Sequence, residues 1–333
     1  MSAPLMAETF LQAINGALRL EMQSDPNVYV LGEDVALGGP YGATKDLAQE
    51  FGENRVINTP ISEGTVVGLA VGAALQGLRP VVEIMFVDFI TLAMDQLVNH
   101  AAKLRYMSGG QLRVPLTIRT ACGVSGAWGA HHSQSLEAWL AHVPGLKVVM
   151  PSTAAEAAGL LRAAIRDDNP VVFVEHRALY YQPDPPDLPP PSSCELGQAR
   201  VRRPGRDVTV IATGRMVRLA LEAAAELAAQ GVEAEIVDPR TVQPLDLLTL
   251  AESVRKTSHA VIVHEAVVPG GIGAEIAAQL QAAAFDYLEA PIERVGAPFA
   301  PVPASPTLEA AYLPDKAAIV AAVLRTMGHG QKA

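Results

Sequence analysis

The amino-acid sequence predicts an α/β fold of two domains, each built on a parallel β-sheet with helices on both faces. Segments with apolar residues at helical spacing alternate with short β-branched runs along nearly the whole chain. A length of 333 residues exceeds one typical domain and suffices for two hydrophobic cores. Between the two parts runs YQPDPPDLPPP (181–191), which is incompatible with a helix interior or a central strand. The prediction is a larger domain at 1–180, a linker at 181–206 and a smaller domain at 207–333.

The larger domain begins with apolar residues at helical spacing and continues into the β-branched run Val28 to Leu31, which ends in Gly-Glu-Asp. The same alternation continues as far as the linker. The predicted elements are helix 7–22, strand 28–31, helix 45–51, strand 56–57, helix 63–76, strand 81–84, helix 90–106, strand 115–119, helix 135–142, strand 147–150, helix 154–167 and strand 171–174.

The smaller domain repeats the alternation with shorter connections. Its predicted elements are strand 208–212, helix 217–230, strand 234–237, helix 245–256, strand 260–264, helix 273–284, strand 292–295 and helix 316–327. The sequence shows no internal repeat strong enough to indicate duplication.

One carboxyl group lies at the start of an unusually apolar helix. Pro60 and Ser62 indicate a helix start, with Ser62 as a candidate cap, and Glu63 opens a segment rich in Ala, Val, Leu and Gly. Gly68, Gly72 and Gly77 are spaced to let another backbone come close. The helix dipole favours the charged form of Glu63 whereas burial favours the neutral form, which suits a proton donor and acceptor. The alternative is that Glu63 only caps its own helix.

Composition narrows the class of protein. Twenty-five basic against 35 acidic residues, a net charge of −10, argue against nucleic acid or an anionic membrane as the main partner. Two cysteines, Cys122 and Cys194, indicate neither a disulfide framework nor a zinc site. The opening MSAPLMAETFLQ contains no basic segment followed by an apolar run, so a cytoplasmic or organelle-matrix protein without a secretory signal is expected.

Several cofactor and catalytic motifs are absent from the sequence. There is no G-x-x-x-x-G-K-[ST] loop, and Gly123-Val124-Ser125-Gly126 lacks the spacing of a nucleophile elbow. The run GGIG at 270–273 does not match the dinucleotide fingerprint and is interpreted as a tight strand-to-helix turn.

A long loop at 121–132 contains three glycines, Trp128 and the pair His131-His132. Adjacent histidines do not form an obvious metal pair. A histidine just before a helix capped by Ser133 or Ser135 is biased toward its neutral form and can exchange protons; a solvated loop histidine is the alternative.

Six segments together carry a resemblance to a known family. They are GEDV at 32–35, RVINTPISE at 55–63, GLRPVVEIMFVDF at 77–89, KLRYMSGG at 103–110, HHSQSLEAWLAHVPGLKVVMPS at 131–152 and RDDNPVVFVEH at 166–176. The chain resembles, over nearly its whole length, the β subunits of thiamine-diphosphate-dependent 2-oxo acid dehydrogenases, including acetoin dehydrogenase. The resemblance implies a transketolase-like pyrimidine-binding domain followed by a C-terminal domain like that of transketolase.

The resemblance also implies roles for particular residues. Glu63 matches the glutamate that hydrogen-bonds N1′ of the aminopyrimidine ring, promoting the imino form whose 4′-nitrogen removes the thiazolium C2 proton. Met85 and Phe89 match the apolar residues around the pyrimidine, for which core packing is the alternative. His132 matches the active-site histidine of the H-S-Q sequence, which assists acyl transfer to lipoamide; relatives often have Gln or Tyr where this chain has His131.

A cation site is implied by some relatives. Main-chain carbonyls there bind potassium at positions matching Leu116, Ala164, Asp167 and Asn169. The helix predicted to end before Pro170 leaves free carbonyls at its negative end, which suits a cation, and satisfaction by water is the alternative.

The diphosphate end of the cofactor site is missing. Family members bind Mg²⁺ through a GDG sequence and a later Asn, and no GDG occurs in this chain. The expectation is that an α subunit holds the Mg²⁺ and completes the active site in an α2β2 heterotetramer. The excess of acidic residues in this chain fits docking to a dihydrolipoyl acyltransferase core through a basic domain of that core.

Two other classes of protein remain as alternatives: a self-sufficient transketolase-type enzyme, and a non-catalytic subunit of a heteromeric electron-transfer or binding protein. Pyruvate, a branched-chain 2-oxo acid and acetoin all remain open as substrates, because one methylene changes binding by only about 1 to 3 kcal/mol. The FVDF and VEH segments favour acetoin or pyruvate slightly.

Overall fold

The computed structural model describes residues 8–185 and 193–328, which pack into two compact units. The first unit contains the described residues of 1–121 and 143–196, and the second contains 122–142 and those of 197–333. The segment 122–142, expected in the larger domain, therefore packs with the second unit. Residues 186–192 of the predicted linker lie outside the described residues.

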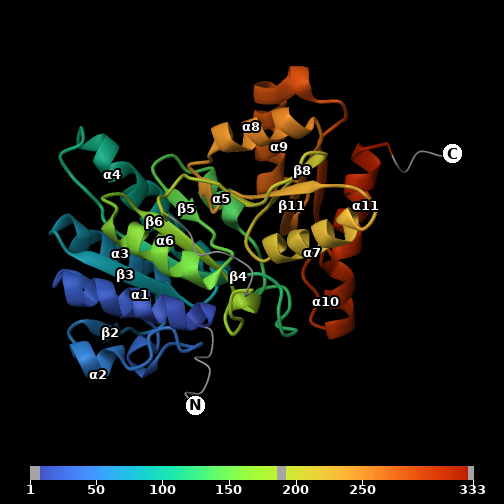
Figure 1. Cartoon of the computed structure of the whole chain (residues 1–333). Coiled ribbons are helices and arrows are strands. Elements are labelled where there is room, and N and C mark those ends of the chain that lie inside the picture. Colours follow the sequence, from blue (N-terminus) through green and yellow to red (C-terminus); the bar gives the residue numbers. More distant parts are fainter. Residues whose placement is uncertain (1–7, 186–192, 329–333) are drawn as a thin grey trace, which may run out of the picture. The chain divides into compact units, whose positions relative to one another are not determined.

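The first unit contains six strands of one sheet, in the order β5-β6-β4-β3-β1-β2 (Figure 1). Strand β1 pairs in parallel with β2 and β3, β3 with β4, and β5 with β6. Its elements are α1 (Phe10–Ser24), β1 (Val28–Gly32), η1 (Val35–Leu37), α2 (Leu47–Phe51), β2 (Val56–Asn58), α3 (Glu63–Leu75), β3 (Arg79–Ile84), η2 (Val87–Ala93), η3 (Asp95–Ala101), α4 (Ala102–Met107), β4 (Thr117–Cys122), β5 (Lys147–Val149), α6 (Ala154–Arg166), β6 (Val171–His176) and η4 (Arg177–Leu179).

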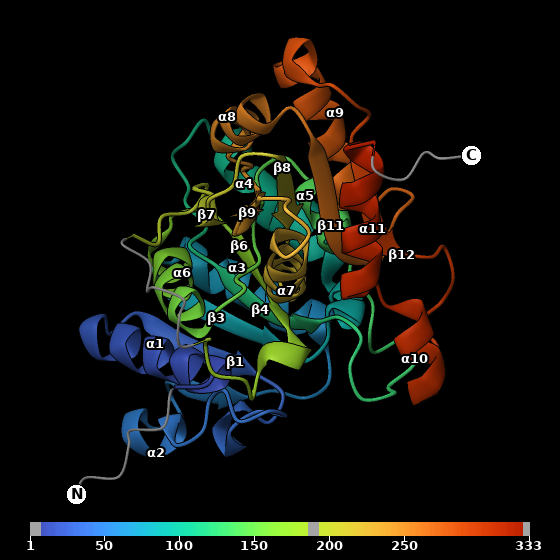
Figure 2. The same cartoon turned by 45° about the vertical axis from the view of Figure 1, so that its right-hand side comes forward.

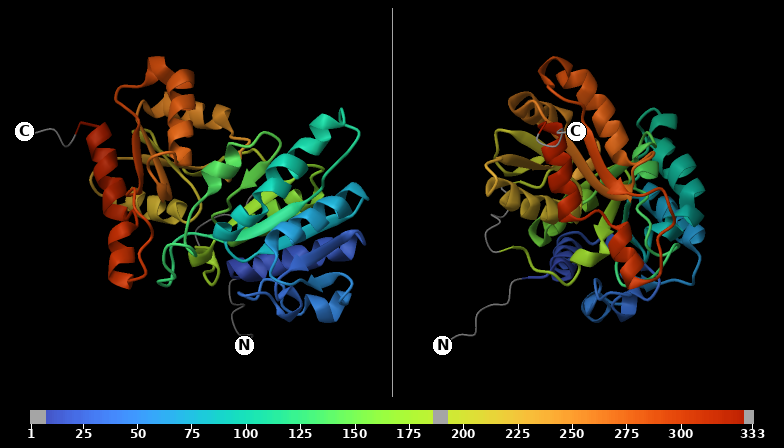
Figure 3. Two further views of the ribbon diagram at one scale, coloured as in Figure 1. Left: turned by 180° about the vertical axis from the view of Figure 1, so that it is seen from behind. Right: turned by 90° about the vertical axis from the view of Figure 1, so that its right-hand side faces the viewer.

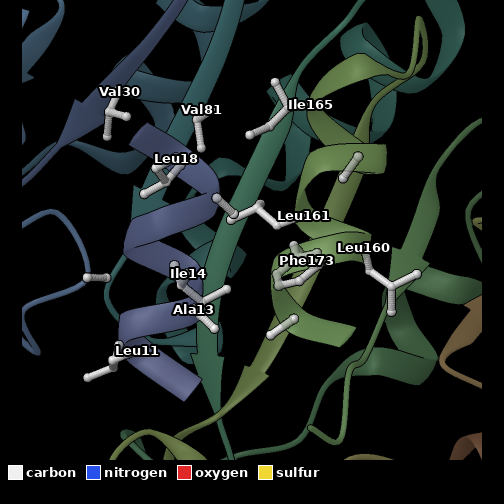
Figure 4. Packing of buried hydrophobic residues seen from close by; sticks show 14 of the residues in the cluster. Leu11, Ala13, Ile14, Leu18, Val30, Val81, Leu160, Leu161, Ile165 and Phe173 are labelled. Carbon is white, nitrogen blue, oxygen red and sulfur yellow. The ribbon is translucent and has the colours of Figure 1, made fainter. Parts of the chain in front are cut away.

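Helices α1 and α6 cover one face of this sheet, and α3 packs on the other (Figures 1 and 3). Figure 4 shows Ile14 and Leu18 of α1 directed toward Leu161 of α6, with Phe173 of β6 beneath them. All four side chains are fully buried. Helix α1 begins where Thr9 accepts the amide hydrogen of Gln12, whose side chain accepts that of Thr9. Helical periodicity and this cap together explain why α1 forms and how it packs.

The second unit is a five-stranded sheet in the order β12-β11-β8-β9-β7, parallel except for the edge strand β7. Helices α7 and α11 lie side by side over one face and build its core (Figure 2). Its elements are α5 (Glu137–Ala141), β7 (Arg200–Arg203), β8 (Val208–Ala212), α7 (Met216–Ala228), β9 (Ala234–Asp238), β10 (Thr241–Gln243), α8 (Leu247–Thr257), β11 (Ala260–Val267), α9 (Ile272–Ala284), η5 (Phe285–Tyr287), β12 (Glu293–Ala297), α10 (Pro306–Tyr312) and α11 (Lys316–Thr326).

The GGIG run connects β11 to α9, as predicted. Its glycines also make room for the buried imidazole of His264, since a Cβ at Gly271 or Gly273 would lie 2.7 or 2.6 Å from that ring. Burial lowers the pKa of His264 to about 4, so the ring is uncharged at neutral pH.

Several local predictions were wrong. The helix predicted at 90–106 is a succession of a 3₁₀ segment (η2), a π-helical segment (η3) and the short helix α4. Strands β7 and β10 and helix α10 were not predicted, and β7 lies inside the segment assigned to the linker. In the described part of the chain, no helix is long and apolar enough to cross a membrane.

Candidate active site

Glu63 is the first residue of α3 and is only 9% exposed. The predicted Ser62 cap is wrong in its chemistry: Ser62 occupies the N-cap position, but its hydroxyl donates to Thr65 Oγ1 at 2.7 Å instead of accepting an amide hydrogen. The backbone oxygen of Ser62 accepts the Val66 amide at 2.9 Å. Glu63 therefore lies at a helix start without a capping side chain, where the helix dipole acts on its carboxyl group.

Glu63 lines a small pocket at the carboxyl ends of three adjacent parallel strands. Gly32 ends β1, Thr59 follows β2, and Ile84 and Met85 end and follow β3. In open α/β sheets this edge is where ligands bind. The pocket is lined by Gly32, Glu33, Thr59, Glu63, Val66, Glu83, Ile84, Met85 and Phe89.

Met85 and Phe89 both line this pocket with Glu63, although they do not share one α-helical turn. Met85 follows β3, and Phe89 lies in the 3₁₀ segment η2. Both side chains are half-buried. The three pocket residues inferred from the sequence are thus brought together, by strand ends and a 3₁₀ turn.

Glu33 and Thr59 are pocket residues that the sequence did not reveal. Burial, followed by the charges of Glu63 and Asp34, raises the pKa of Glu33. Thr59 presents a buried hydroxyl that has no hydrogen-bond partner among the described residues. Their positions in the sequence could have indicated this, because Glu33 lies in the Gly-Glu-Asp run that ends the first strand and Thr59 follows the second strand. The pocket therefore offers two interacting carboxyl groups and a hydroxyl to a polar ligand.

A buried ionic network lies under the pocket. Arg119 donates through Nη1 to Glu83 Oε2 at 2.6 Å, and through Nε and Nη2 to Glu175 at 2.8 and 2.9 Å. Tyr180 donates its hydroxyl to Glu175 at 2.9 Å. Burial raises the pKa of Glu83, and Arg119 opposes that rise. Pairing and bidentate geometry compensate for the loss of water around these charges.

Gly39, in the loop between η1 and α2, lies close to this network. Its φ of +70° is in the left-handed region, and a Cβ there would be 2.6 Å from Glu83 Oε1. Only glycine fits both the backbone conformation and the space.

The close approach of another backbone predicted at Gly68, Gly72 and Gly77 is not found within this chain. A Cβ at Gly68 would meet only a side-chain carbon of Gln96, at 3.4 Å, and a Cβ at Gly72 or Gly77 would meet nothing within 4 Å outside the adjoining backbone. The close backbone contact of α3 lies instead at Gly64, which was not predicted: a Cβ there would be 3.1 Å from the backbone oxygen of Leu92. Gly77 has a φ of +92°, which explains a glycine at the helix end.

His132 lies in the second unit, in the segment 122–142. Its ring is 4.6 Å from that of His131 and 6.1 Å from that of Trp128, measured between centroids. The predicted Ser133 or Ser135 cap is wrong: α5 begins at Glu137, with Leu136 at the N-cap position and no capping side chain. His132 is half-exposed within an aromatic group of the loop.

The carbonyls predicted to bind potassium lie near the end of α6, and three of them already accept hydrogen bonds. Leu116 accepts from the Val171 amide at 2.8 Å, and Ala164 from the Asp167 amide at 3.2 Å. The carbonyl of Asp167 accepts from Arg79 Nη1 at 3.2 Å. The Arg79 guanidinium thus supplies positive charge at the negative end of this helix.

The Asp167 side chain adds to this cluster. It pairs with Lys147 and accepts from the backbone and side-chain nitrogens of Asn169 at 2.8 Å. Burial raises the pKa of Asp167, but hydrogen bonds from Lys147 and Asn169 outweigh that effect and lower it overall. Within residues 8–185 and 193–328, no cluster of three His, Cys, Asp or Glu side chains could hold a metal ion.

Comparisons with known proteins agree with this geometry. A transketolase pyrimidine-binding domain matches residues 8–183, and a transketolase C-terminal domain matches residues 197–319. The chain is similar to the solved structure of a split-gene transketolase, an inactive beta4 tetramer, with a TM-score of 0.79 and 27% identity over 97% of this chain and 99% of that one.

Two curated relatives are more similar in sequence. The pyruvate dehydrogenase E1 component subunit beta of Rhizobium meliloti (strain 1021) is 46% identical, over 95% of this chain and 69% of the relative. The acetoin:2,6-dichlorophenolindophenol oxidoreductase subunit beta of Bacillus subtilis (strain 168) is 45% identical, over 95% of this chain and 96% of the relative. The chain therefore belongs to the family of pyruvate and acetoin dehydrogenase β subunits, which joins a transketolase pyrimidine-binding domain to a transketolase C-terminal domain.

Proposed function

We propose that this chain is the β subunit of the decarboxylating first component of a 2-oxo acid or acetoin dehydrogenase complex, active with thiamine diphosphate after assembly with an α subunit. The observation that carries the proposal is the Glu63 pocket at the carboxyl ends of β1, β2 and β3. A carboxyl at a helix start, beside apolar Met85 and Phe89, matches what an aminopyrimidine ring requires.

The pocket residues fit the pyrimidine end of the cofactor. Thr59 offers a buried hydroxyl without a partner among the described residues, and the half-buried Met85 and Phe89 offer apolar surface. When bound, thiamine diphosphate supplies the carbon nucleophile that attacks the substrate carbonyl. Glu63 holds and moves a proton at N1′ of the pyrimidine, and its neighbour Glu33 adds a second carboxyl to the site.

His132 has a separate role in this proposal. Its imidazole donates and accepts protons while the acyl group passes to lipoamide, the disulfide acceptor. The contacts with His131 and Trp128 hold the ring within the loop.

An α subunit is needed because this chain has no GDG sequence with which to hold Mg²⁺. The outward face of α3 supports docking there. Leu69 of α3 is 58% exposed, neighbouring Ile61 and Leu92 are also exposed, and Gly72 has open space around it. Exposed apolar side chains, together with the open space at Gly72, would allow a helix of another chain to pack closely against α3. The split-gene transketolase neighbour, titled an inactive beta4 tetramer, agrees with a β chain that is inactive by itself.

The stoichiometry proposed is α2β2, and the partner of this assembly is a lipoyl-bearing dihydrolipoyl acyltransferase core. The net charge of −10 favours a basic docking domain on that core. Pyruvate and acetoin are the substrates proposed first, because the two curated relatives carry those names.

Potassium binding at Leu116, Ala164, Asp167 and Asn169 stays a prediction. Each carbonyl oxygen has two lone pairs, so the observed hydrogen bonds leave acceptor capacity, but Arg79 already neutralises the helix end. A melting temperature that is higher in KCl than in NaCl at equal ionic strength would support the ion site.

The experiment is co-expression with a candidate α subunit, followed by dye-reduction assays with pyruvate, 3-methyl-2-oxobutanoate, 2-oxoglutarate and acetoin. Turnover of one substrate that disappears without thiamine diphosphate supports the proposal and identifies the substrate. Tight assembly without turnover of any substrate, unchanged by adding the cofactor, favours a non-catalytic binding subunit. Full activity of the isolated chain would instead support a self-sufficient enzyme.

A further inference from the structure

Residues 122–142, here called the histidine loop, are anchored at two points near their first residues. The amide of Gly123 donates to the carbonyl of Gln134 at 3.1 Å, which closes the stretch that contains His131 and His132. The next amide, that of Val124, donates to Glu265 Oε1 at 2.5 Å. A short hydrogen bond to a carboxylate is a strong one, so Glu265 fixes the start of the loop to β11.

Glu265 lies in an environment that supports its charge. It is buried on β11, and Arg215 Nη1 lies 3.7 Å from its second carboxyl oxygen. Burial, and then the charge of Glu265, raises the pKa of Tyr312 on α10. Arginine on one side and the Val124 amide on the other compensate for the water that burial removes.

Glu137 lies at the other end of the loop, as the first residue of α5, and has no exposed surface. Neither of its carboxyl oxygens has a hydrogen-bond partner among the described residues. Burial raises the pKa of Glu137 to about 7; its own backbone amide opposes the rise, and the charge of Glu265 adds to it. The carboxyl group therefore changes its charge near neutral pH, because burial penalises the charged form.

The histidine loop and Glu265 also line one cavity of about 440 Å³. Ser133, Gln134 and Ser135, which directly follow His132, lie on its wall together with Glu265, Tyr312 and the residues 299–302. Any movement of the loop relative to β11 would therefore change both this cavity and the placement of His132.

We propose that Glu265 is a positioning residue for the histidine loop, because it anchors the Val124 amide to β11. The inference rests on the role of His132 in the proposed function. It deepens that function, because it assigns the placement of the acyl-transfer histidine to a glutamate that does not itself line the cofactor pocket around Glu63.

The test uses the assembled complex with the α subunit and compares two rates. The first is dye-linked turnover, and the second is lipoamide-linked turnover, which also requires acyl transfer. Glu265→Ala should lower the lipoamide-linked rate by about tenfold or more while changing the dye-linked rate far less, because misplacement of a reacting group is costly. Glu265→Gln keeps an acceptor for Val124 and should recover most of that loss.

Glu235→Gln is the matched control. Glu235 is a buried strand glutamate of the same sheet, on β9, and pairs with Lys256 away from the histidine loop. This variant should affect both rates equally. Equal losses of both rates in Glu265→Ala would overturn the positioning role, as would a Glu265→Gln variant no better than Glu265→Ala.

Amide hydrogen exchange in the isolated chain provides a readout that does not depend on activity. Glu265→Ala should speed exchange at Val124 and across the loop, and Glu265→Gln should restore protection. If the wild-type complex turns over no substrate, the proposed function fails, and this measurement still decides whether Glu265 anchors the loop. Unchanged exchange in Glu265→Ala would refute the anchor.

Discussion

At the residue scale, Glu63 combines burial with a position at a helix start and a second carboxyl nearby. Burial raises the pKa of Glu33 and the charge of Glu63 adds to the rise, and both residues line the pocket that also contains Met85 and Phe89. A residue that only capped its helix would not require this neighbourhood. The pocket therefore favours proton transfer over capping as the reason for a glutamate at this position.

Replacing Glu63 by Gln should abolish most of the catalytic activity while leaving assembly intact. The substitution keeps the size of the side chain and removes the proton that it exchanges, so a loss of about 10²- to 10⁴-fold in dye-linked turnover is expected. Glu53→Gln, at an exposed glutamate before β2, is the control and should keep the wild-type rate. An unchanged rate in Glu63→Gln would reduce Glu63 to a structural residue.

Glu137 predicts a particular dependence of stability on pH. Its pKa is about 7 in the folded chain against 4.5 for an ordinary glutamate, so the folded state binds the proton more tightly than the unfolded state. Stability from this group is therefore highest below about pH 4.5, falls as the pH rises to about 7, and is constant above that. The total loss is about 3 kcal/mol. Urea unfolding from pH 5 to 8 should show this loss in the wild type relative to Glu137→Gln; parallel curves would contradict it.

At the element scale, α3 distinguishes two kinds of glycine. Gly64 lies against the backbone of η2, where a Cβ would be 3.1 Å from the Leu92 carbonyl oxygen, whereas Gly72 faces open space. A glycine inside a helix costs about 0.5 to 1 kcal/mol relative to alanine. At Gly64 the close contact accounts for that cost, and at Gly72 nothing in this chain does.

The two positions should respond differently to alanine. In the isolated chain, Gly72→Ala should raise the free energy of unfolding by about 0.5 to 1 kcal/mol, whereas Gly64→Ala should lack that gain because the backbone of η2 cannot easily move away. Denaturant unfolding measures both. If α3 docks on the α subunit, Gly72→Ala should also weaken assembly; equal stability changes in the two variants would count against the packing argument.

At the scale of the whole molecule, carboxyl and apolar groups line one pocket, which we assign to the pyrimidine end of thiamine diphosphate, and the chain has no GDG sequence for the Mg²⁺ end. The expected outcome is that the isolated chain shows no turnover and gains activity in proportion to added α subunit until the two are equimolar. Analytical ultracentrifugation gives the stoichiometry, and omission of thiamine diphosphate is the control. Activity that does not depend on the α subunit would refute the proposal that this chain holds only part of the active site.

The sequence predicted the regular elements well because their signals are local. Helices α1 and α6 and the central strands follow from apolar periodicity, and α3 follows from a run of apolar and small residues after Pro60 and Ser62. It predicted the segment at 90–106 poorly, because its apolar spacing is helical while the structure divides it between 3₁₀, π and α turns. The segment also packs against α3 through η2 and η3, and the spacing of its apolar residues does not reveal these contacts.

The sequence by itself determined the α/β class, the strand-and-helix order, and, through motifs at Glu63, Met85, Phe89 and His132, the candidate site residues. The tertiary structure alone brought Glu33, Thr59 and Glu83 beside Glu63, because they lie at the ends of strands that become neighbours only when the sheet forms. It also joined Glu265 to Val124, residues 141 positions apart in the chain. Local patterns specify elements, whereas side-chain charge and burial depend on neighbours that only folding provides.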